Sequence, residues 1–340
     1  MRPDSPRHAA LRQFAIAGLA DPTLTLAPAS VDASFRSYWR STGEHGNHIV
    51  MDAPPEHEDI APWLDVAVRL EKAGVHVPHI VASDVTQGFV LMEDLGNRTY
   101  LPELNADSVN ALYGAALDTL LAMQTGADAS GLPSYDRERL LTEMRLLPTW
   151  FLERHLGHAP TDDETAIIER AFGWLADVAA EQPAVFVHRD FHSRNLLVCE
   201  QGDPGVIDFQ DAVLGPMTYD LVSLLRDCYI EWEDARVEAW VESYRLRAVE
   251  AGLIEPGVDA QTFQRWFDLI GVQRHIKVLG IFCRLWYRDG KPQYLGDLPL
   301  VWRYIARIAR RYPELAELLA LLESAVGYRD LTHAVSPTLA

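Results

Sequence analysis

The sequence stretch Val185–Ala212 reads VFVHRDFHSRNLLVCEQGDPGVIDFQDA, and the interpretation of the rest of the chain follows from it. Three polar residues stand between apolar runs: Asp190, then Asn195, then Asp208. The turn-forming residues EQGDP separate two strand-like runs, which predicts a hairpin over residues 196–209. Such a hairpin delivers Asp208 beside the loop that carries Asp190 and Asn195.

These residue types at these spacings suit the transfer of a phosphoryl group. That reaction needs an acceptor hydroxyl held in line and metal ions that neutralise the phosphate oxygens. Asp190 can accept the hydroxyl proton, with His188 bracing the loop. Asn195 and Asp208 offer the hard oxygen donors that Mg²⁺ prefers. Asp and Asn also occur in the turns of ordinary hairpins, but the three spacings together favour a phosphoryl-transfer centre.

This segment resembles the catalytic loop of the aminoglycoside phosphotransferase and choline kinase-like branch of the protein-kinase fold, which reads His-x-Asp-x-His-x-x-Asn. Those positions are filled here by His188, Asp190, His192 and Asn195. The resemblance implies an α+β, bilobal fold with a small β-rich N-lobe and a large, mainly helical C-lobe. The expected parts are a nucleotide-binding lobe over residues 1–94, a catalytic and substrate lobe over 95–330, and a tail over 331–340. ATP and Mg²⁺ are the implied cofactors.

Four further segments resemble the bacterial anomeric kinases of amino sugars that serve cell-wall recycling. They are QDAVLGPMTYDLVSLLRDCY at 210–229, SFR at 34–36, VMDAPP at 50–55 and QRHIK at 273–277. The likeness covers the chain from about Val31 to Tyr312. It implies ATP-dependent phosphorylation of the anomeric (C1) hydroxyl of N-acetylmuramate and N-acetylglucosamine. The alternatives are a kinase of another small hydroxyl compound (aminoglycoside, choline or homoserine) and a nucleotide-binding pseudokinase.

The predicted N-terminal lobe departs from the usual kinase pattern. Kinases of this fold carry a lysine that holds the α- and β-phosphates, but the corresponding predicted strand His48–Asp52 contains none. Arg36 or Arg40 could supply this charge from the preceding strand, or the backbone and the metals could carry more of it; we favour Arg36. The small polar turn that ends at Ser34 would cover the phosphates with backbone N–H groups.

The resemblance also implies positions for the adenine and for the sugar. The adenine edge would meet backbone groups of the hinge residues Met92, Glu93, Asp94 and Leu95. The expected sugar contacts are Asp211, Arg226, Asp227, Tyr229, Arg274, His275 and Lys277. The segment Arg274–Lys277 is basic in an acidic protein, so an anionic group such as the lactyl carboxylate of N-acetylmuramate suits it; a solvated helical face is the alternative. Asp220 is expected to brace the catalytic loop from behind.

Charge and composition limit the classes of molecule that the protein is expected to bind. The formal charge of −19 disfavours nucleic acids and anionic membranes as partners. The three cysteines are odd in number and widely spaced, which predicts neither a disulfide framework nor a zinc site. No run approaches the ~18–20 apolar residues of a membrane span, and Phe14–Ala20 is too short for a signal peptide. A cytoplasmic protein that binds small molecules is expected; the sequence does not specify the oligomeric state, and a monomer is assumed.

Hydrophobic periodicity predicts the remaining elements. Helices are expected over residues 11–19, 59–72, 137–156, 162–181, 264–287, 301–312 and 314–326, with another starting near Asp107. Strands are expected over residues 35–41, 48–52, 76–82 and 88–92. Pro22 and Pro28 are expected to break the pattern between the first helix and the first strand.

Overall fold

The computed structural model describes residues 5–31, 35–44, 46–200 and 204–334. The chain divides into two compact units. Unit 1 consists of residues 1–128 and 194–211, and unit 2 of residues 129–193 and 212–340. Residues 95–128 therefore belong to the same compact unit as the N-terminal strands. The sequence predicts the boundary between the lobes after residue 94, at the expected hinge. That boundary is defined differently from the two compact units, and it stays a prediction.

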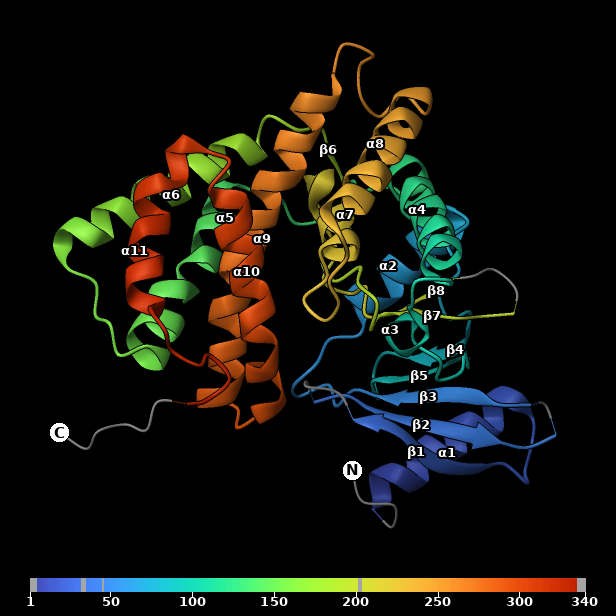
Figure 1. Cartoon of the computed structure of the whole chain (residues 1–340). Helices are drawn as coiled ribbons and strands as arrows, with labels where there is room; N and C mark the ends of the chain where they lie inside the picture. Colours follow the sequence, from blue (N-terminus) through green and yellow to red (C-terminus); the bar gives the residue numbers. More distant parts are fainter. Residues whose placement is uncertain (1–4, 32–34, 45, 201–203, 335–340) are drawn as a thin grey trace. The chain divides into compact units, whose positions relative to one another are not determined.

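Unit 1 is built on a five-stranded antiparallel sheet in the order β1-β2-β3-β5-β4 (Figure 1). The strands are β1 (Thr25–Val31), β2 (Ser37–Thr42), β3 (His48–Asp52), β4 (Ile80–Asp84) and β5 (Phe89–Glu93). β1 was not predicted, because Pro28 was interpreted as a break. Proline is tolerated in an edge strand, where its missing N–H removes no ladder bond. The register of β1 on β2 shifts between Pro28 and Ser30.

Helix α1 (Pro6–Leu19) packs on this sheet. The shared core consists of Leu11, Ala15, Leu24, Trp39, Val50, Phe89 and Leu91. Ser5 caps the helix by accepting the backbone N–H of His8, and Pro6 suits the first turn. A Cβ atom on Gly18 would lie 2.7 Å from the end of the Leu91 side chain, so glycine allows the helix to approach the sheet without displacing Leu91.

The remainder of unit 1 carries the predicted hairpin. Helices α2 (Ala61–Lys72), α3 (Tyr100–Glu103) and α4 (Val109–Gly126) accompany strands β7 (Leu196–Leu197) and β8 (Gly205–Val206). β7 and β8 pair antiparallel, which confirms the hairpin, although the ladder is much shorter than predicted. The N–H of Val206 donates to the carbonyl of His76 and the N–H of Val198 to that of Arg98, both at 2.8 Å. These bonds fix the hairpin to segments on either side of β4 and β5.

Unit 2 is mainly helical, with one two-stranded ladder between β6 (Ala184–Val187) and β9 (Val213–Pro216). Its helices are α5 (Arg137–Met144), the π-helical η1 (Leu147–His155), α6 (Asp162–Ala179), α7 (Thr218–Leu225), α8 (Asp234–Glu250), α9 (Ala260–Tyr287), the 3₁₀ segments η2 (Pro292–Asp297) and η3 (Pro313–Leu315), α10 (Leu298–Ala309) and α11 (Ala316–Val326). The long helix α9 contacts α5, η1, α6, α7, α8, η2 and α10 (Figure 1). It is the central element of this unit.

The predicted α+β class, β-rich at the N-terminus and mainly helical beyond it, is confirmed. The helix predicted over 137–156 is instead divided into α5 and η1, because Pro148 in the first turn of η1 cannot donate to the preceding turn. Helix α8 was not predicted. None of the helices in the described part of the chain has the length and apolar character of a membrane-spanning segment.

Candidate active site

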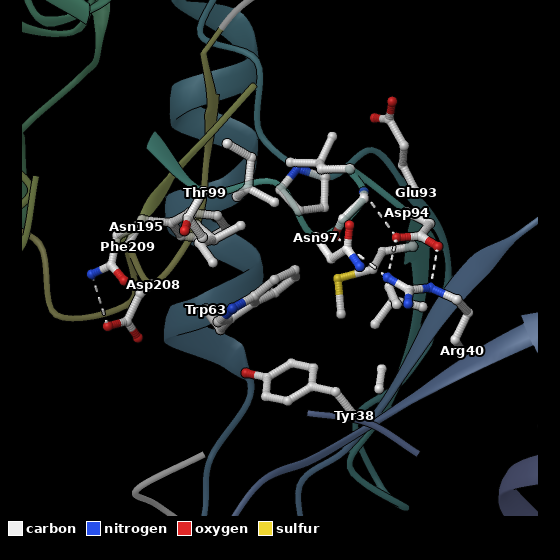
Figure 2. Close-up of a pocket in the computed structure, with 18 residues that line it drawn as sticks. Tyr38, Arg40, Trp63, Glu93, Asp94, Asn97, Thr99, Asn195, Asp208 and Phe209 are labelled. Atoms are coloured by element: carbon white, nitrogen blue, oxygen red, sulfur yellow. Dashed lines mark hydrogen bonds and ion pairs between the residues drawn. The ribbon is translucent and has the colours of Figure 1, made fainter. Parts of the chain in front are cut away.

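A pocket of about 470 Å³ lies in unit 1 (Figure 2). Its walls are mainly apolar, with side chains from β3, α2, β5 and the hairpin: Ile49, Trp63, Met92, Leu197, Ile207 and Phe209. The ring of Trp63 lies 5.0 Å from that of Phe209. Figure 2 shows Asn195 and Asp208 on one side of the cavity and Arg40, Glu93 and Asp94 on the opposite side. An apolar cavity with a few polar groups at its edges is typical of a small-molecule site.

The four residues predicted for the hinge all line this pocket: Met92, Glu93, Asp94 and Leu95. The carboxylate of Asp94 accepts two hydrogen bonds from Arg40, at 2.5 Å from Nε and 3.0 Å from Nη2, and a third from the N–H of Gly96 at 3.0 Å. The hydrogen bond to Asp94 raises the pKa of Arg40. The guanidinium of Arg40 is therefore committed to the hinge side of the pocket.

The second arginine that the sequence offered has a different neighbour. Nη2 of Arg36 lies 3.8 Å from Oδ1 of Asp208, and its side chain is only 10% exposed. The geometry thus separates the two candidates, since Arg40 faces Asp94 and Arg36 faces Asp208. Ser34, the third residue expected near the phosphates, lies outside the described residues.

Asn195 and Asp208, predicted as a pair, lie side by side. Nδ2 of Asn195 donates to Oδ2 of Asp208 at 3.3 Å (Figure 2), and Nε2 of Gln210 donates to Oδ1 at 3.0 Å. The N–H of Ile207 donates to the carbonyl of Asn195 at 3.1 Å, which joins their two segments. Asp208 has φ +64°, a left-handed conformation that is rare without glycine and is concentrated at functional sites. An amide oxygen and a half-exposed carboxylate fit the hard donor set of a magnesium ion.

The catalytic loop begins in unit 2 and continues into unit 1 after Ser193. In unit 2, Asp220 in the first turn of α7 accepts the N–H of His188 at 2.6 Å and of Arg189 at 2.9 Å. This is the bracing contact expected for Asp220. Burial raises the pKa of Asp220 to about 7, against the effect of the two N–H donors, which favour the charged form. Arg189 has φ +78°, so the loop is held in an uncommon conformation directly before Asp190.

Asp190 itself is half-buried among cations. Its N–H donates to Nδ1 of the buried His188 at 3.2 Å. Burial alone would raise the pKa of the Asp190 carboxyl, but Lys277, His192, Arg274 and Arg189 outweigh it and bring the pKa below its usual value. The carboxylate is therefore held in its charged form. The ring of His192 also lies 5.4 Å from that of Tyr229.

Three of the predicted sugar contacts are engaged inside unit 2. Arg226 is 2% exposed and pairs with Asp268 at 2.6 Å. Asp227 is buried and accepts the N–H of Ser193 at 3.0 Å and its hydroxyl at 2.5 Å. Nε2 of His275 lies 2.9 Å from the Arg226 carbonyl. These contacts indicate that the three residues shape the unit from within.

The other predicted sugar contacts differ in exposure. Asp211 is exposed in unit 1, and Tyr229 is half-exposed in unit 2. Arg274 is 3% exposed, and in the described part of the chain its guanidinium makes one hydrogen bond, from Nη1 to Sγ of Cys228 at 3.3 Å. Burial opposes the charge on Arg274, but Cys228, Tyr219 and Asp190 raise its pKa. Lys277 is buried in a polar cluster that is described below.

Several residues of the site escaped the sequence analysis. Tyr38, Trp63 and Asn97 line the pocket, and Gln210 holds Asp208. Trp63 was predicted only as an apolar helix residue, and Tyr38 carried no signal beyond its strand. Gln210 could have been found, since it is two residues from Asp208.

Known proteins support the same class of chemistry. The phosphotransferase enzyme family matches residues 25–253. The chain is 48% identical over 303 residues to an N-acetylmuramate/N-acetylglucosamine kinase of Pseudomonas aeruginosa, covering 89% of each chain. It is 44% identical over 308 residues to a protein of the same name from Neisseria meningitidis, covering 89% of this chain and 91% of that one.

The fold is also that of a solved phosphotransferase. The ADP-bound structure of the aminoglycoside phosphotransferase APH(2'')-Ib superimposes with a TM-score of 0.58 and 14% identity, covering 88% of this chain and 98% of the other. The pocket, the Asn195–Asp208 pair and the braced catalytic loop are arranged on this fold. The family match spans both the pocket and the loop, and the chain belongs to the phosphotransferase enzyme family.

Proposed function

We propose that this phosphotransferase is an ATP- and Mg²⁺-dependent kinase that phosphorylates the anomeric C1 hydroxyl of N-acetylmuramate and N-acetylglucosamine in peptidoglycan recycling. The observation that carries the choice of substrate is the 48% identity, over 89% of both chains, to a kinase named for these two sugars. The pocket and the Asn195–Asp208 pair support the phosphotransfer itself.

The pocket of unit 1 would hold ATP. Backbone groups of residues 92–95 would meet the adenine edge, and the ring would lie against Ile49 and Trp63. Arg36 would take the place of the absent lysine at the phosphates, because Arg40 is committed to Asp94 while Arg36 lies near Asp208. The turn that ends at Ser34 would cover the phosphates.

Asn195 and Asp208 would hold the magnesium ion, through an amide oxygen and a carboxylate. Bound there, the ion would neutralise charge on the phosphate oxygens. Arg36, 3.8 Å from Asp208, would add positive charge on the same side. Gln210 would keep the carboxylate of Asp208 in place.

Asp190 would orient the C1 hydroxyl and accept its proton as transfer proceeds, with His188 supporting the loop. The lowered pKa of Asp190 makes it a weak base. An anomeric hydroxyl is more acidic than an ordinary sugar hydroxyl, so a weak base suffices. Positioning of the hydroxyl would then supply most of the catalysis.

Arg274 and Tyr229 of unit 2 would contact the sugar. In the described residues, Arg274 has no carboxylate within ion-pair distance, although it is almost fully buried. A buried guanidinium of this kind suits the lactyl carboxylate of N-acetylmuramate. N-acetylglucosamine lacks this carboxylate, so Arg274 would discriminate between the two sugars. Arg226, Asp227 and His275 would support this region from within.

The test is phosphate transfer from γ-labelled ATP, with Mg²⁺, to N-acetylmuramate, N-acetylglucosamine, kanamycin and choline, followed by NMR of the product. A C1-phosphosugar is expected. The methyl glycoside of N-acetylglucosamine is the matched control, because it lacks the anomeric hydroxyl and should not be phosphorylated. Transfer to the methyl glycoside would contradict the anomeric position, and transfer only to kanamycin or choline would contradict the sugar.

The variant Arg274→Met tests the proposed discrimination. Loss of a charge-assisted hydrogen bond worth ~1.5–3 kcal/mol should lower kcat/KM for N-acetylmuramate about 10- to 100-fold more than for N-acetylglucosamine. Steady-state kinetics on both sugars give this ratio. Arg145→Met, which removes a surface arginine paired with Glu169, is the control. An equal loss on both sugars would contradict the contact with the carboxylate.

A further inference from the structure

A closed group of polar side chains lies in unit 2 beside the catalytic loop, and the proposed mechanism does not use it. Its members, here called the Glu143 cluster, are Tyr135, Glu143, Arg189, Tyr219 and Lys277. They come from the segment before α5, from α5, from the catalytic loop, from α7 and from α9. Segments far apart in the sequence thus meet at one carboxylate.

Both oxygens of Glu143 are engaged. Oε1 lies 2.5 Å from Nη2 of Arg189, and Oε2 lies 3.1 Å from Nζ of Lys277 and accepts the hydroxyl of Tyr135. Burial alone would raise the pKa of Glu143, but Lys277 and Arg189 outweigh it and lower the pKa. Glu143 is therefore a charged carboxylate shared by two cations.

Lys277 has no donor left for a sugar. An ammonium group has three N–H donors. Nζ lies 3.1 Å from Glu143 Oε2, 3.1 Å from the Tyr219 hydroxyl and 3.5 Å from the Tyr135 hydroxyl. The side chain is 8% exposed, and Tyr219 and Glu143 outweigh burial to raise its pKa, so it stays charged. These contacts oppose the direct sugar contact that the sequence suggested for Lys277.

Arg189 connects the cluster to the reacting carboxylate. Its guanidinium is held by Glu143, its N–H by Asp220, and its carbonyl accepts the hydroxyl of Ser223 at 3.4 Å. It immediately precedes Asp190 and has φ +78°. The loop motif His-x-Asp leaves the position of Arg189 open, so the contact with Glu143 is a property of this chain's own residues.

We propose that Glu143 and Lys277 are positioning residues, which fix Arg189 and so hold the carboxylate of Asp190 in place without touching the sugar. This inference rests on the proposed sugar kinase activity. Two cations share one carboxylate, so the cluster also places a net positive charge beside Asp190. Lys277 is the cation that lowers the pKa of Asp190 most, ahead of His192, Arg274 and Arg189. Asp220 on α7 faces the same loop, and the negative charge of Asp190 contributes to the raised pKa of Asp220.

The test is steady-state kinetics against pH for Lys277→Met, Lys277→Arg and Glu143→Gln, with ATP and the sugar that the wild type phosphorylates. Lys277→Met should lower kcat roughly 10- to 100-fold while the KM for the sugar stays within about twofold. In the profile of kcat against pH for this variant, the acidic limb, where Asp190 takes up a proton, should move to higher pH. Glu143→Gln removes a negative charge, so its limb should move to lower pH. Lys277→Arg should restore most of kcat.

The outcomes separate this inference from the alternatives. A raised KM with unchanged kcat and unchanged pH limb would show that Lys277 contacts the sugar and would overturn the proposal. Shifts of the acidic limb in the same direction for Lys277→Met and Glu143→Gln would also overturn the proposal. Removing a positive and a negative charge should move the limb in opposite directions, whereas a general loosening of the fold would move it the same way in both variants. Arg145→Met, at the end of α5 in an exposed ion pair, should behave as the wild type.

Two controls keep the result readable. Thermal unfolding identifies a variant that has not folded. If Lys277→Met is one, Glu143→Gln still tests the proposal through the expected shift of its acidic limb to lower pH, and Lys277→Arg tests it through a kcat close to that of the wild type. A wild type that phosphorylates neither sugar would overturn the proposed function alone. The variants are then compared on whichever acceptor the wild type does phosphorylate.

Discussion

The two units differ in where their polar and charged side chains lie. The pocket of unit 1 is mainly apolar, and two of the charged residues that line it, Arg40 and Asp94, pair with each other at the edge. Unit 2 instead encloses some of its charged pairs, namely Lys277 with Glu143 in the Glu143 cluster and Arg226 with Asp268. Shape and backbone groups would therefore recognise the nucleotide, whereas fixed charges would position the chemistry.

Under the proposed function, this difference would account for the absence of the usual phosphate-binding lysine from unit 1. Binding in an apolar pocket is spread over many contacts, so under the proposed function another cation, Arg36, would serve where the usual lysine is absent. In unit 2, removing one partner of a buried ion pair leaves the other uncompensated, at a cost of about 3–5 kcal/mol. Exposed pairs such as Arg145–Glu169 contribute only about 0–1 kcal/mol.

The largest expected effect is that of Asp190→Asn in unit 2. Loss of the proton acceptor should lower kcat about 10²- to 10⁴-fold. The affinity for ATP should change less than about twofold, because Asp190 does not line the pocket of unit 1. Turnover assays and nucleotide titration check the two halves of this prediction. Turnover close to the wild type would contradict the assignment of the base, and a large loss of ATP affinity would contradict the assignment of ATP binding to the pocket of unit 1.

Asp208→Ala in unit 1 is expected to have a smaller effect, on a different quantity. In the presence of Mg²⁺ the affinity for ATP should fall roughly 10- to 100-fold, since a metal ligand is lost. In EDTA the variant and the wild type should bind ATP alike. Isothermal titration in both buffers makes the comparison, with Asp65→Ala, in an exposed ion pair on α2, as the matched control. Equal affinities at fixed Mg²⁺ would refute the ligand role.

The sequence identified those parts of the site that lie close together along the chain. His188, Asp190, Asn195 and Asp208 fall within the single stretch Val185–Ala212, so their spacing alone places them near one another. The pocket walls could not be found this way. Trp63 lines the cavity only because α2 packs beside the hairpin, and a helical period shows a buried face without its partner.

The Glu143 cluster shows the same limit more clearly. The sequence made Lys277 a basic residue on a long helix, and charge alone suggested an anionic substrate. The structure gives it Glu143, a residue with no signal of its own, 134 positions earlier in the chain. Two prolines also separate the predicted elements from the observed ones. Pro28 lies inside a strand, because proline is tolerated at a sheet edge. Pro148 divides the helix predicted over residues 137–156, because it cannot donate to the preceding turn.

The smallest expected effect tests burial in unit 2 through pH. His275 is 1% exposed, stacks on Tyr304 at 4.9 Å and bonds to the carbonyl of Arg226. Burial lowers the pKa of His275 to about 3, so the folded protein keeps it neutral while the unfolded chain takes up a proton below about pH 6.5. Stability is therefore lost as the pH falls from about 6.5 towards 3.

In His275→Gln this loss should be absent. Between pH 6 and pH 5 the free energy of unfolding of the wild type should fall by about 1 kcal/mol more than that of the variant. Urea unfolding at both pH values measures this difference, and between pH 7.5 and 8.5 the two proteins should show the same slope, because His275 is then neutral in both states. Equal slopes between pH 6 and 5 would mean that His275 takes up its proton in the folded protein too. That result would show that a polar side chain of α9 is not held away from solvent, and it would weaken the contrast between the apolar pocket of unit 1 and the buried polar groups of unit 2.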